Sequence, residues 1–440
     1  MKRLALTALA VAICLALGWM VAAPGPQAAV DAASKRELLQ GYRQLAHRSY
    51  EAAYHSAGRL KTRIAALLAE PSESKLRQAQ QAWREAHRDY SQTEAFRFGH
   101  WIVDEWETAV NAWPVDEGLL DYVGDPYAAS PTNPLARHNL VSRSSIRVNG
   151  LSLDATRLDW AQLKFIHGGS DVEANVVLGY HAIEFLLWGQ DRRQTEAGAG
   201  QRPWTDFADE RGTCTSGPQA AAPEHCQRRR RLLQIMVEHL YQQLGDMALH
   251  WAGNSPTSYG LHIVSGDADE GLRRLLFSLI RLSGDEMAGE RMQVALLTHA
   301  PEEEQDCFSD DTHQSAYHNA LGIQNIYYGR HQNRGYKNGE GYQAAVSLAA
   351  LARRLDAPLA ERIEQALAET EQVLARIRQE GENGQPFDLL IQPGNAAGAQ
   401  RIQQAITALQ AESQLLEQLG ERLALGPLNP RAASSEPAIR

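Results

Sequence analysis

The segment from Gly179 to Gly189 constrains the fold most, because it is an almost entirely apolar run that carries one imidazole and one carboxylate. The sequence Ser-Asp-Val-Glu at residues 170–173 fits a capping box, which predicts that a helix begins near residue 171. Side chains three residues apart lie on one face of a helix, so we expect His181 and Glu184 to point to the same spot. A buried imidazole beside a buried carboxylate is costly unless the two pair, bind a metal or take part in a reaction.

The H-x-x-E spacing alone does not decide between these roles. A hydrogen-bonded pair in the core would explain His181 and Glu184 without any ligand. The H-E-x-x-H motif of zinc peptidases supplies two histidines from one helix, whereas this segment supplies one. Its order is also the reverse of the Glu-x-x-His order in carboxylate-bridged di-iron bundles, although it offers the same two kinds of ligand. Further ligands have to come from other parts of the chain.

The beginning of the chain has the form of a secretory signal. Basic residues after the first Met precede an apolar run from Leu4 to Ala23, and small residues that suit cleavage follow up to Ala29. We therefore predict a signal peptide over residues 1–29 and a periplasmic protein, with a retained N-terminal anchor as the alternative. No later segment has about 18 uninterrupted apolar residues, so a second membrane span is not expected.

The rest of the chain is acidic. The formal net charge of −10 becomes −12 when the Lys and the Arg of the signal are removed, which disfavours nucleic acid and anionic membrane surfaces as partners. The sequence has no P-loop, dinucleotide-binding fingerprint or C-x-x-C-H haem motif, which argues against those chemistries. Cys214 and Cys226 stand at the ends of a Gly/Pro/Ala-rich loop and are predicted to form a disulfide in an oxidising compartment, which leaves Cys307 free.

Helical periodicity dominates the chain, and 440 residues with 44% hydrophobic content can bury a large core. We predict an all-α protein of two helical-bundle domains with long irregular connections. The first domain, at 31–255, carries the H-x-x-E helix, the second is a helical bundle at 256–426, and a flexible tail follows at 427–440. Outside the H-x-x-E segment, the main predicted helices cover residues 34–70, a stretch that begins at Pro71, and residues 224–251, 270–281, 284–298, 313–328, 341–355, 358–379 and 397–425.

Several further polar side chains are candidates for a site: Glu94, Arg97, Asp116, Glu290 and Arg291. Glu94 and Arg97 stand near the end of the second helix, where they could simply pair with each other at i, i+3. Asp116 belongs to an acidic loop, and most acids in such loops are solvated or cap helices. The sequence Ser-Gly-Asp-Glu at 283–286 fits another capping box, which explains Glu286 but does not explain Glu290 or Arg291.

Residues 307–313 form the second informative segment. Ser309 with Asp310 or Asp311 can cap the helix that follows. His313, in the first turn of that helix, is expected to be neutral and able to bind a metal, because the helix dipole opposes a cation there. We expect most of the histidines that show no pattern to lie at the surface, namely His87, His100, His318 and His331.

Together these motifs resemble the imelysin family, and more closely its iron-regulated protein A branch. The resemblance is carried by Phe-Arg-Phe-Gly at 96–99, Asn-Ala-Trp-Pro at 111–114, the G-x-H-x-x-E segment at 179–189, Leu-Ser at 282–283 with Glu-Arg-Met at 290–292, and Cys-Phe-Ser-Asp at 307–310 with Thr-His at 312–313. The motifs occur in family order. Where members commonly read Ser-Asp-Asn-Thr-His, this chain has Asp311 in place of the asparagine.

The resemblance implies an exported, all-helical protein of two bundle-like domains, with the G-x-H-x-x-E helix near their interface and expression linked to iron supply. It also implies two functions that disagree, a metallopeptidase and a component of iron uptake. A metallopeptidase needs about three protein ligands, an open position for water and a general base; the sequence leaves the base unnamed, and Glu184 is the candidate catalytic residue. A binding protein needs only a carboxylate-rich pocket with a histidine. We favour iron binding in iron uptake or homeostasis, with zinc or manganese as alternative metals and a secreted or periplasmic metallopeptidase that uses His181 and Glu184 as the second hypothesis.

The hypothesis places one polar pocket between the two domains. The predicted metal ligands are His181, Glu184, Glu94, Asp310 and His313. The other predicted pocket residues are Arg97, Asp116, Glu290, Arg291 and Ser309. In this site His181 is the nitrogen ligand, Glu184 is an oxygen ligand or the orienting partner of the imidazole, and Arg97 holds an anion or carboxylate. The expected partners are a metal ion or an iron-related small ligand, and membrane components of iron transport.

Overall fold

The structure is a computed structural model of the chain, and it describes residues 30–125, 127, 129–193, 198–210, 212–331 and 341–428. The predicted signal peptide at 1–29 lies outside the described residues, as do all but the first two residues of the predicted tail at 427–440. Within the described ranges, no helix combines the length and the apolar character that a membrane span requires.

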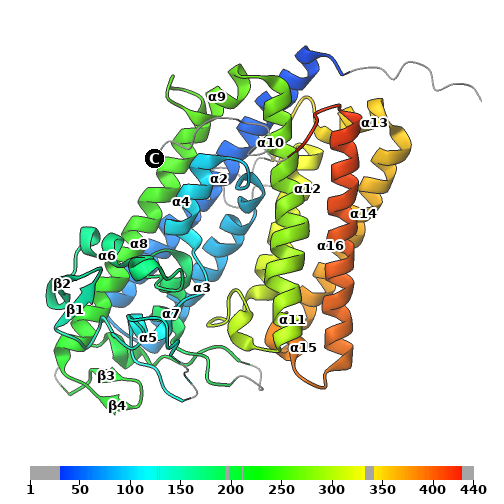
Figure 1. The fold of residues 1–440 in the computed structure, drawn as a ribbon. Helices are drawn as coiled ribbons and strands as arrows, with labels where there is room; N and C mark the ends of the chain where they lie inside the picture. The colour runs from blue at the N-terminus through cyan, green and yellow to red at the C-terminus, as the bar shows by residue number, and fades with distance from the viewer. Residues whose placement is uncertain are drawn as a thin grey trace, which may run out of the picture.

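Three long helices form one side of the molecule (Figure 1): α2 (Ala32–Ala69), α3 (Glu73–Ser91) and α8 (Pro223–Ala252). α2 packs along both of the others. The side chains of Asp31 and Ser72 accept backbone N–H groups in the first turns of α2 and α3, which satisfies donors that a helix start leaves free. The predicted helices at 34–70, from Pro71 and at 224–251 are confirmed.

Shorter elements fill the chain between α3 and α8: α4 (Trp101–Asn111), α5 (Glu117–Leu120), α6 (Trp160–Ile166) and α7 (Gly179–Trp188). The strands are described as two-stranded antiparallel ribbons: β1 (Ser145–Val148) with β2 (Leu151–Asp154), β3 (Thr215–Ser216) with β4 (Gln219–Ala220), and β5 (Arg330–His331) with β6 (Tyr342–Gln343). In the longest ribbon Ser145 faces Asp154 and Val148 faces Leu151. These ribbons are small beside the helices, so the predicted all-α class is confirmed.

The second half of the chain is a bundle of helices (Figure 1): α9 (Tyr259–Ser265), α10 (Ala268–Ile280), α11 (Val294–Thr298), α12 (Thr312–Tyr328), α13 (Leu348–Leu355), α14 (Ala357–Glu382), α15 (Phe387–Ile391) and α16 (Ala396–Arg422). α14 packs between α12 and α16, and α10 packs against α16. The helix predicted at 341–355 begins only at Leu348, because the Ser347 side chain caps it there and β6 occupies the residues before.

Buried apolar side chains form two clusters. One unites α10, α12, α13, α14 and α16 and includes the first part of α2, from Leu38 to Tyr50. The other unites α3, α7 and most of α8 and includes the second part of α2, from Ala53 to Leu67. α2 therefore packs in both clusters. The predicted domain division at residues 255 and 256 stays a prediction, because shared packing does not test whether the halves fold independently.

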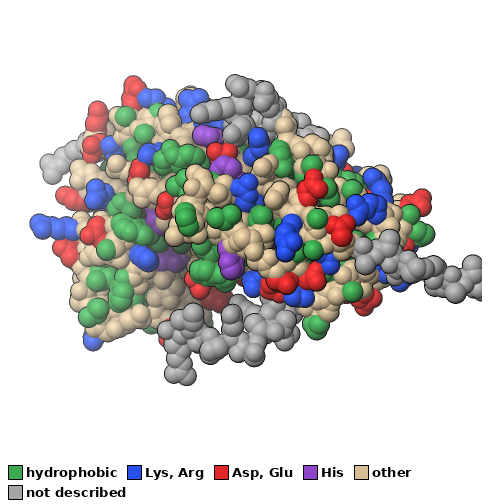
Figure 2. All heavy atoms as spheres, turned by 90° about the horizontal axis from the view of Figure 1, so that it is seen from above, with side chains coloured by type: hydrophobic (Ala, Val, Ile, Leu, Met, Phe, Trp, Pro, Cys, Tyr) green, Lys and Arg blue, Asp and Glu red, His purple; other side chains and the backbone are tan. Residues whose placement is uncertain are grey.

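The surface carries interspersed charges of both signs. Figure 2 shows Lys and Arg side chains among Asp and Glu side chains across the face seen from above. A large field of one sign is what steers nucleic acid or an anionic membrane to a protein. The face seen in Figure 2 has charges of both signs.

The G-x-H-x-x-E helix begins eight residues later than the capping box at 170–173 predicts. Ser170 and Asp171 have positive φ angles of 62° and 55°, and the chain from there to Leu178 is not an α-helix. α7 begins at Gly179, whose φ is 87° and where an added Cβ would lie 2.4 Å from the carbonyl oxygen of Val110. The helix therefore begins where only glycine lets it approach α4.

The capping box predicted at 283–286 is also wrong. The chain stays helical from Ala268 to Thr298, and its middle, Arg281–Gln293, is a π-helix. The Ser283 hydroxyl is buried and donates to the carbonyl oxygen of Leu409, so it packs against α16 and caps nothing. A π-helix is rare and is often found at functional sites.

Candidate metal centre

α7 is buried on every side, which explains why its sequence is apolar around the whole helix. All ten of its residues are buried, and it packs against α3, α4 and α8. His181 and Glu184 are both fully buried, and the Nδ1 atom of His181 lies 3.1 Å from Oε2 of Glu184. The predicted meeting of the two side chains on one helix face is therefore observed.

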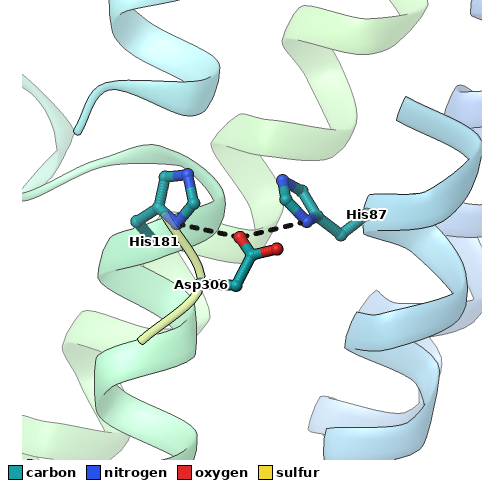
Figure 3. A group of neighbouring side chains, drawn as sticks. All are labelled: His87, His181 and Asp306. Carbon is teal, nitrogen blue, oxygen red and sulfur yellow. Dashed lines mark ion pairs between the residues drawn. The ribbon is translucent and has the colours of Figure 1, made fainter. Parts of the chain in front are cut away.

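Two further residues meet this pair, His87 from α3 and Asp306 from the segment before α12 (Figure 3). One ligand atom from each of His87, His181 and Asp306 lies within 4.8 Å of the other two. Oδ1 of Asp306 is 3.5 Å from Nδ1 of His87 and 3.6 Å from Nδ1 of His181. We call His87, His181, Glu184 and Asp306 the histidine centre.

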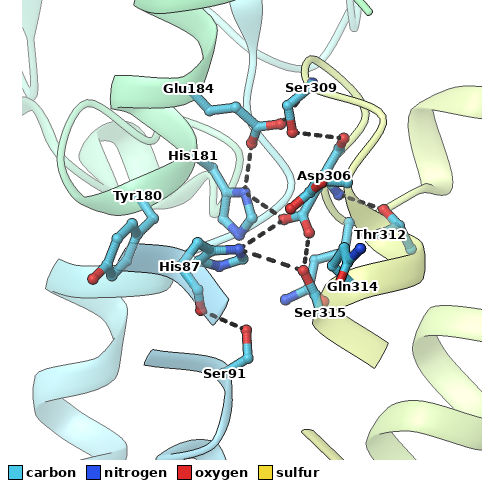
Figure 4. Close-up of polar contacts among 12 residues, drawn as sticks. His87, Ser91, Tyr180, His181, Glu184, Asp306, Ser309, Thr312, Gln314 and Ser315 are labelled. Atoms are coloured by element: carbon cyan, nitrogen blue, oxygen red, sulfur yellow. Dashed lines mark hydrogen bonds and ion pairs between the residues drawn. The ribbon is translucent and has the colours of Figure 1, made fainter. Parts of the chain in front are cut away.

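Each carboxylate of the histidine centre accepts a hydrogen bond from a neighbour outside the centre (Figure 4). Oε1 of Glu184 accepts the backbone N–H of Ser309 at 2.8 Å, and Oδ2 of Asp306 accepts the hydroxyl of Ser315. Oδ1 of Asp306 and Nε2 of His181 are buried and have no hydrogen-bond partner in the described part of the chain. Buried polar atoms without partners are uncommon in folded proteins and call for an explanation.

His87 is oriented by an amide. Its Nε2 lies 3.0 Å from Oδ1 of Asn111, and Nδ2 of the same amide donates to Oε1 of Glu94 at 3.0 Å. Since Glu94 accepts from the amide nitrogen, the amide oxygen faces His87 and takes the proton of Nε2. The other ring nitrogen, Nδ1, then carries its lone pair toward Asp306, which is how partners outside a metal site prepare a ligand histidine.

Burial favours the uncharged forms of Glu184, Asp306 and His181 in the histidine centre. It raises the pKa of Glu184 well above its ordinary value, and the nearby Asp306 raises it further. Burial also raises the pKa of Asp306, against the opposing effect of His87. Burial lowers the pKa of His181 well below its ordinary value, and His87 and Arg291 add to that shift. A bound cation would favour ionised carboxylates and neutral imidazoles, the forms in which they bind metal.

The spacing of the donors fits a metal ion. Two ligands that are each about 2.1 Å from a tetrahedral ion lie about 3.4 Å apart. The separations of 3.5 and 3.6 Å between Asp306 and the two imidazoles are close to this value. Two imidazoles with one or two carboxylates suit zinc, iron and manganese. His87, His181 and Asp306 are therefore the residues that fit a metal, and Glu184, whose Oε2 lies 3.1 Å from the same nitrogen of His181, is a further oxygen donor beside them.

Comparison with known proteins gives the family. The sequence profile of the imelysin family, described as peptidase family M75, matches residues 46–416. The chain belongs to the imelysin family. A search of curated proteins gave no match.

Solved structures support the same fold. A Parabacteroides distasonis protein provisionally assigned as an iron-regulated protein A precursor has 15% sequence identity and a TM-score of 0.64, over 90% of this chain and 96% of its own. An imelysin-like protein from Psychrobacter arcticum has 14% identity and a TM-score of 0.54, over 88% of this chain and 95% of its own. At these identities the likeness supports the fold alone.

In this imelysin, Glu94 and Arg97 do not pair with each other. Glu94 accepts from Arg291 at 2.6 Å, whereas Arg97 lies 3.2 Å from Glu107. Glu286 bridges the two guanidiniums, at 2.9 Å from Arg291 and 3.8 Å from Arg97. Arg97 was predicted to hold an anion or carboxylate in the metal pocket. Its charge is instead compensated by Glu107 and Glu286 in a separate network. Glu94 contacts the histidine centre only through Asn111.

The other predicted site residues lie at different places. Asp116 accepts from Tyr127 and Asn133 in its own loop, and Glu290 is exposed on the π-helix. Asp310 and His313 line a neighbouring pocket at the surface and are not among the three grouped ligands. Their segment reaches the histidine centre through Ser309, while the side chains of Asp310 and His313 line the neighbouring pocket, and their role as ligands stays a prediction.

Ser309 is the predicted residue from this segment that does contact the centre, and it does so through its backbone N–H. The disulfide prediction is confirmed, because Cys214 and Cys226 are bonded with their Cα atoms 6.0 Å apart, and Cys307 is free.

The sequence reasoning missed His87 and Asp306. His87, His100 and His331 are buried, so the expectation that most of the unpatterned histidines lie at the surface is wrong. A signal for His87 existed: it follows Trp83 by four residues on the apolar side of α3, and the two rings stack at 4.8 Å. Asp306 had none, because it follows an acidic run that looks solvated.

Proposed function

We propose that this imelysin-family protein binds a metal ion, with iron as the favoured ion, at His87, His181 and Asp306. The observation that carries the proposal is Oδ1 of Asp306, a buried oxygen without a hydrogen bond among the described residues, between two imidazole nitrogens at 3.5 and 3.6 Å. A cation between these atoms would explain why the oxygen lacks a partner. Asn111 would hold the imidazole of His87 in the orientation that binding needs, and Oε2 of Glu184 would be a further oxygen donor beside Nδ1 of His181.

Iron is favoured over other ions by two arguments. The donors are nitrogen and oxygen without sulfur, which suits iron and manganese as well as zinc and does not favour copper(I). The Parabacteroides distasonis neighbour is described as iron-regulated, and the proposal carries that link to this chain. Manganese and zinc remain the competing ions for the experiment below.

Binding is favoured over a peptidase activity because the centre is closed. His181, Glu184 and Asp306 are 0% exposed, whereas a catalytic metal needs an open position for water and substrate. Glu184, the candidate general base, is already engaged by His181 at one oxygen and by Ser309 at the other. A base that activates water needs a free oxygen directed at that water.

Periplasmic export, iron uptake and membrane transport partners are part of this proposal. The predicted signal peptide supports export. The Cys214–Cys226 disulfide also supports it, since such bonds persist in oxidising compartments. Binding of a metal or an iron-related ligand outside the cytoplasm would place the protein before a membrane transporter in the route of the ion.

The test is a titration of the mature protein with Fe(II), Mn(II) and Zn(II), in which calorimetry measures binding. We expect tight binding of one ion, and a loss of about 100-fold or more in His181→Ala and in Asp306→Asn, because each removes a ligand. His239→Ala is the matched control, since His239 is also buried but stacks on Trp160. Equal affinity in all four proteins would overturn the proposal, and cleavage of an unfolded protein only with metal present would replace it by the peptidase hypothesis.

A further inference from the structure

A pocket of about 460 Å³ opens at the surface beside the histidine centre. It is lined by α3, by the segment 309–314, by residues 198 and 199, and by the end of α14 with the residues that follow it. These elements come from both hydrophobic clusters. We call it the side pocket. Its volume is within the usual range of small-molecule sites, about 300–1,000 Å³.

The side pocket and the histidine centre share a wall. Ser309 lines the pocket, and its backbone N–H donates to Glu184 of the centre. Arg84 lines the pocket and donates to the carbonyl oxygen of the same Ser309 at 2.7 Å. α3 carries His87 on its buried side and Arg84 and Arg88 on the pocket side. A molecule in the pocket would therefore contact the residues that hold the centre.

The pocket contains two guanidiniums with unused hydrogen-bond donors. Arg84 and Arg88 both contact Asp311, at 3.4 and 3.2 Å, so two guanidiniums share one carboxylate. Two more acids line the pocket: Asp310, whose Oδ2 accepts the backbone N–H of Gly198 at 3.0 Å, and Glu382, which accepts from Gln314 at 2.8 Å and lies 3.9 Å from Arg378. Each guanidinium has five N–H donors, and most of these have no acceptor among the described residues.

Two buried polar atoms in the lining have no partner in the described ranges. They are Nδ1 of His313 and Oδ1 of Asp310, and their residues are 6% and 9% exposed. Gly381 lets α14 approach the His313 ring closely, because an added Cβ would lie 2.4 Å from its Cγ atom. The pocket thus has two buried polar atoms without hydrogen bonds next to two guanidiniums.

We propose that the side pocket binds a carboxylate group of a small organic chelator that accompanies the metal ion to the histidine centre. This proposal rests on the proposed function, and it specifies that the metal ion arrives bound to a chelator. A guanidinium matches a carboxylate with two parallel hydrogen bonds. Asp310 and Glu382 also line the pocket, and they would oppose the nearly double charge of a phosphate more than the single charge of a carboxylate. The unpartnered imidazole of His313 can bond a hydroxyl or second carboxyl of the same molecule.

The experiment measures binding of citrate, inorganic phosphate and a short peptide with a free C-terminus by calorimetry, without metal. Arg88→Ala is the test variant, because Arg88 lines the pocket and its side-chain hydrogen bonds among the described residues go to Asp311 alone. Arg77→Ala is the matched control, since Arg77 is on α3 but pairs with Glu73 at the surface. We expect citrate to bind, a loss of about tenfold or more in Arg88→Ala, and no change in Arg77→Ala.

His181→Ala separates this proposal from the proposed function. We expect it to bind citrate normally but to bind the iron(III)–citrate complex more weakly than the wild type does, whereas Arg88→Ala weakens both. No citrate binding, equal citrate binding in wild type and Arg88→Ala, or stronger binding of phosphate or the peptide would overturn the proposal while leaving metal binding intact. Citrate binding that depends on Arg88, in a protein that binds no metal, would instead overturn the proposed function and keep the carboxylate site.

Discussion

Two wholly buried polar clusters in this protein are built in opposite ways. In one, which we call the arginine cluster, two carboxylates face two guanidiniums from different parts of the chain: Asp121, Arg202, Asp206 and Arg229. Asp121 accepts from Arg229 at 2.6 Å and from Arg202 at 2.8 Å, and Asp206 accepts from Arg202 at 2.9 Å. In the histidine centre, carboxylates face two imidazoles, and burial lowers the pKa of that of His181 well below its ordinary value.

The pKa shifts record the difference. Burial alone would raise the pKa of Asp121, but Arg229 and Arg202 outweigh it and hold that pKa below its ordinary value. Burial raises the pKa of Asp306, and no guanidinium forms an ion pair with it among the described residues. A buried charged cluster is therefore not in itself a sign of function. In the arginine cluster every carboxylate oxygen accepts a hydrogen bond, whereas in the histidine centre Oδ1 of Asp306 has no partner among the described residues.

The largest expected effect breaks the arginine cluster. Asp121→Asn removes the carboxylate that compensates Arg202 and Arg229, and leaves buried guanidinium charge behind. We expect the free energy of unfolding to fall by about 3–5 kcal/mol, measured by urea denaturation at pH 7. Asp209→Asn is the control, because Asp209 is exposed and lies 3.9 Å from Arg230. A loss no greater than in the control would mean that the arginine cluster does not stabilise the fold.

The parts of the fold that depend on local pattern could be predicted from the sequence. α2, α3 and α8 carry their apolar periodicity and, in two cases, a capping side chain within their own residues. The start of α7 could not be predicted, because it depends on the approach of Gly179 to Val110, which lies far away in the sequence. The π-helix was missed because a capping-box sequence occurs in the middle of a continuous helix.

The same distinction applies to the candidate site. His181 and Glu184 meet because they are three residues apart on one helix, and helix geometry was enough to predict it. Asp306 reaches them from a loop more than a hundred residues later, and no local pattern marks it. The pairing of Glu94 with Arg291 in place of Arg97 depends in the same way on the packing of α12 and the π-helix around the end of α3.

A lone buried carboxylate elsewhere sharpens the comparison. Glu412 of α16 is buried, and burial raises its pKa to about 7, against the opposing hydrogen bonds of Thr370 and Ser283. The folded protein then keeps a proton that the unfolded chain loses near pH 4.3, so stability falls as the pH rises between these values. We expect Glu412 to cost roughly 3 kcal/mol between about pH 4.5 and 7.

Glu412→Gln provides the measurement for this prediction. The difference in free energy of unfolding between wild type and variant isolates the titration of Glu412 from that of other groups. The wild type should lose stability relative to the variant as the pH rises. A difference that does not change with pH would mean that Glu412 is ionised in the folded protein and has a partner for its charge.

A smaller effect is expected from the amide that orients His87. Asn111→Leu removes the acceptor for Nε2 of His87 and the donor to Glu94, so the imidazole can adopt the wrong tautomer or turn away. We expect metal affinity to fall about 10–100-fold, measured by the same titration as above. Asn133→Ala is the control, since Asn133 is a buried amide bonded to Asp116 and Asn175. Equal metal affinity in Asn111→Leu and wild type would remove Asn111 from the site.

The smallest effect on stability is expected at Asp306, and it separates the two clusters most directly. Asp306→Asn is the same chemical change as Asp121→Asn, but among the described residues Asp306 has no ion pair with a guanidinium. The amide oxygen of asparagine can still accept the hydroxyl of Ser315. Without metal, we therefore expect the free energy of unfolding to change by no more than about 1 kcal/mol.

Added metal should make the wild type clearly more stable than Asp306→Asn. At a free ion concentration of about 100 times Kd, the wild type gains about 2.7 kcal/mol from binding to the folded state, and the variant gains little because it lacks a ligand. Urea denaturation with and without the ion measures both values. If Asp306→Asn without metal cost as much as Asp121→Asn, the histidine centre would be a second structural cluster, since its carboxylate would already have the partner that the proposal assigns to a metal.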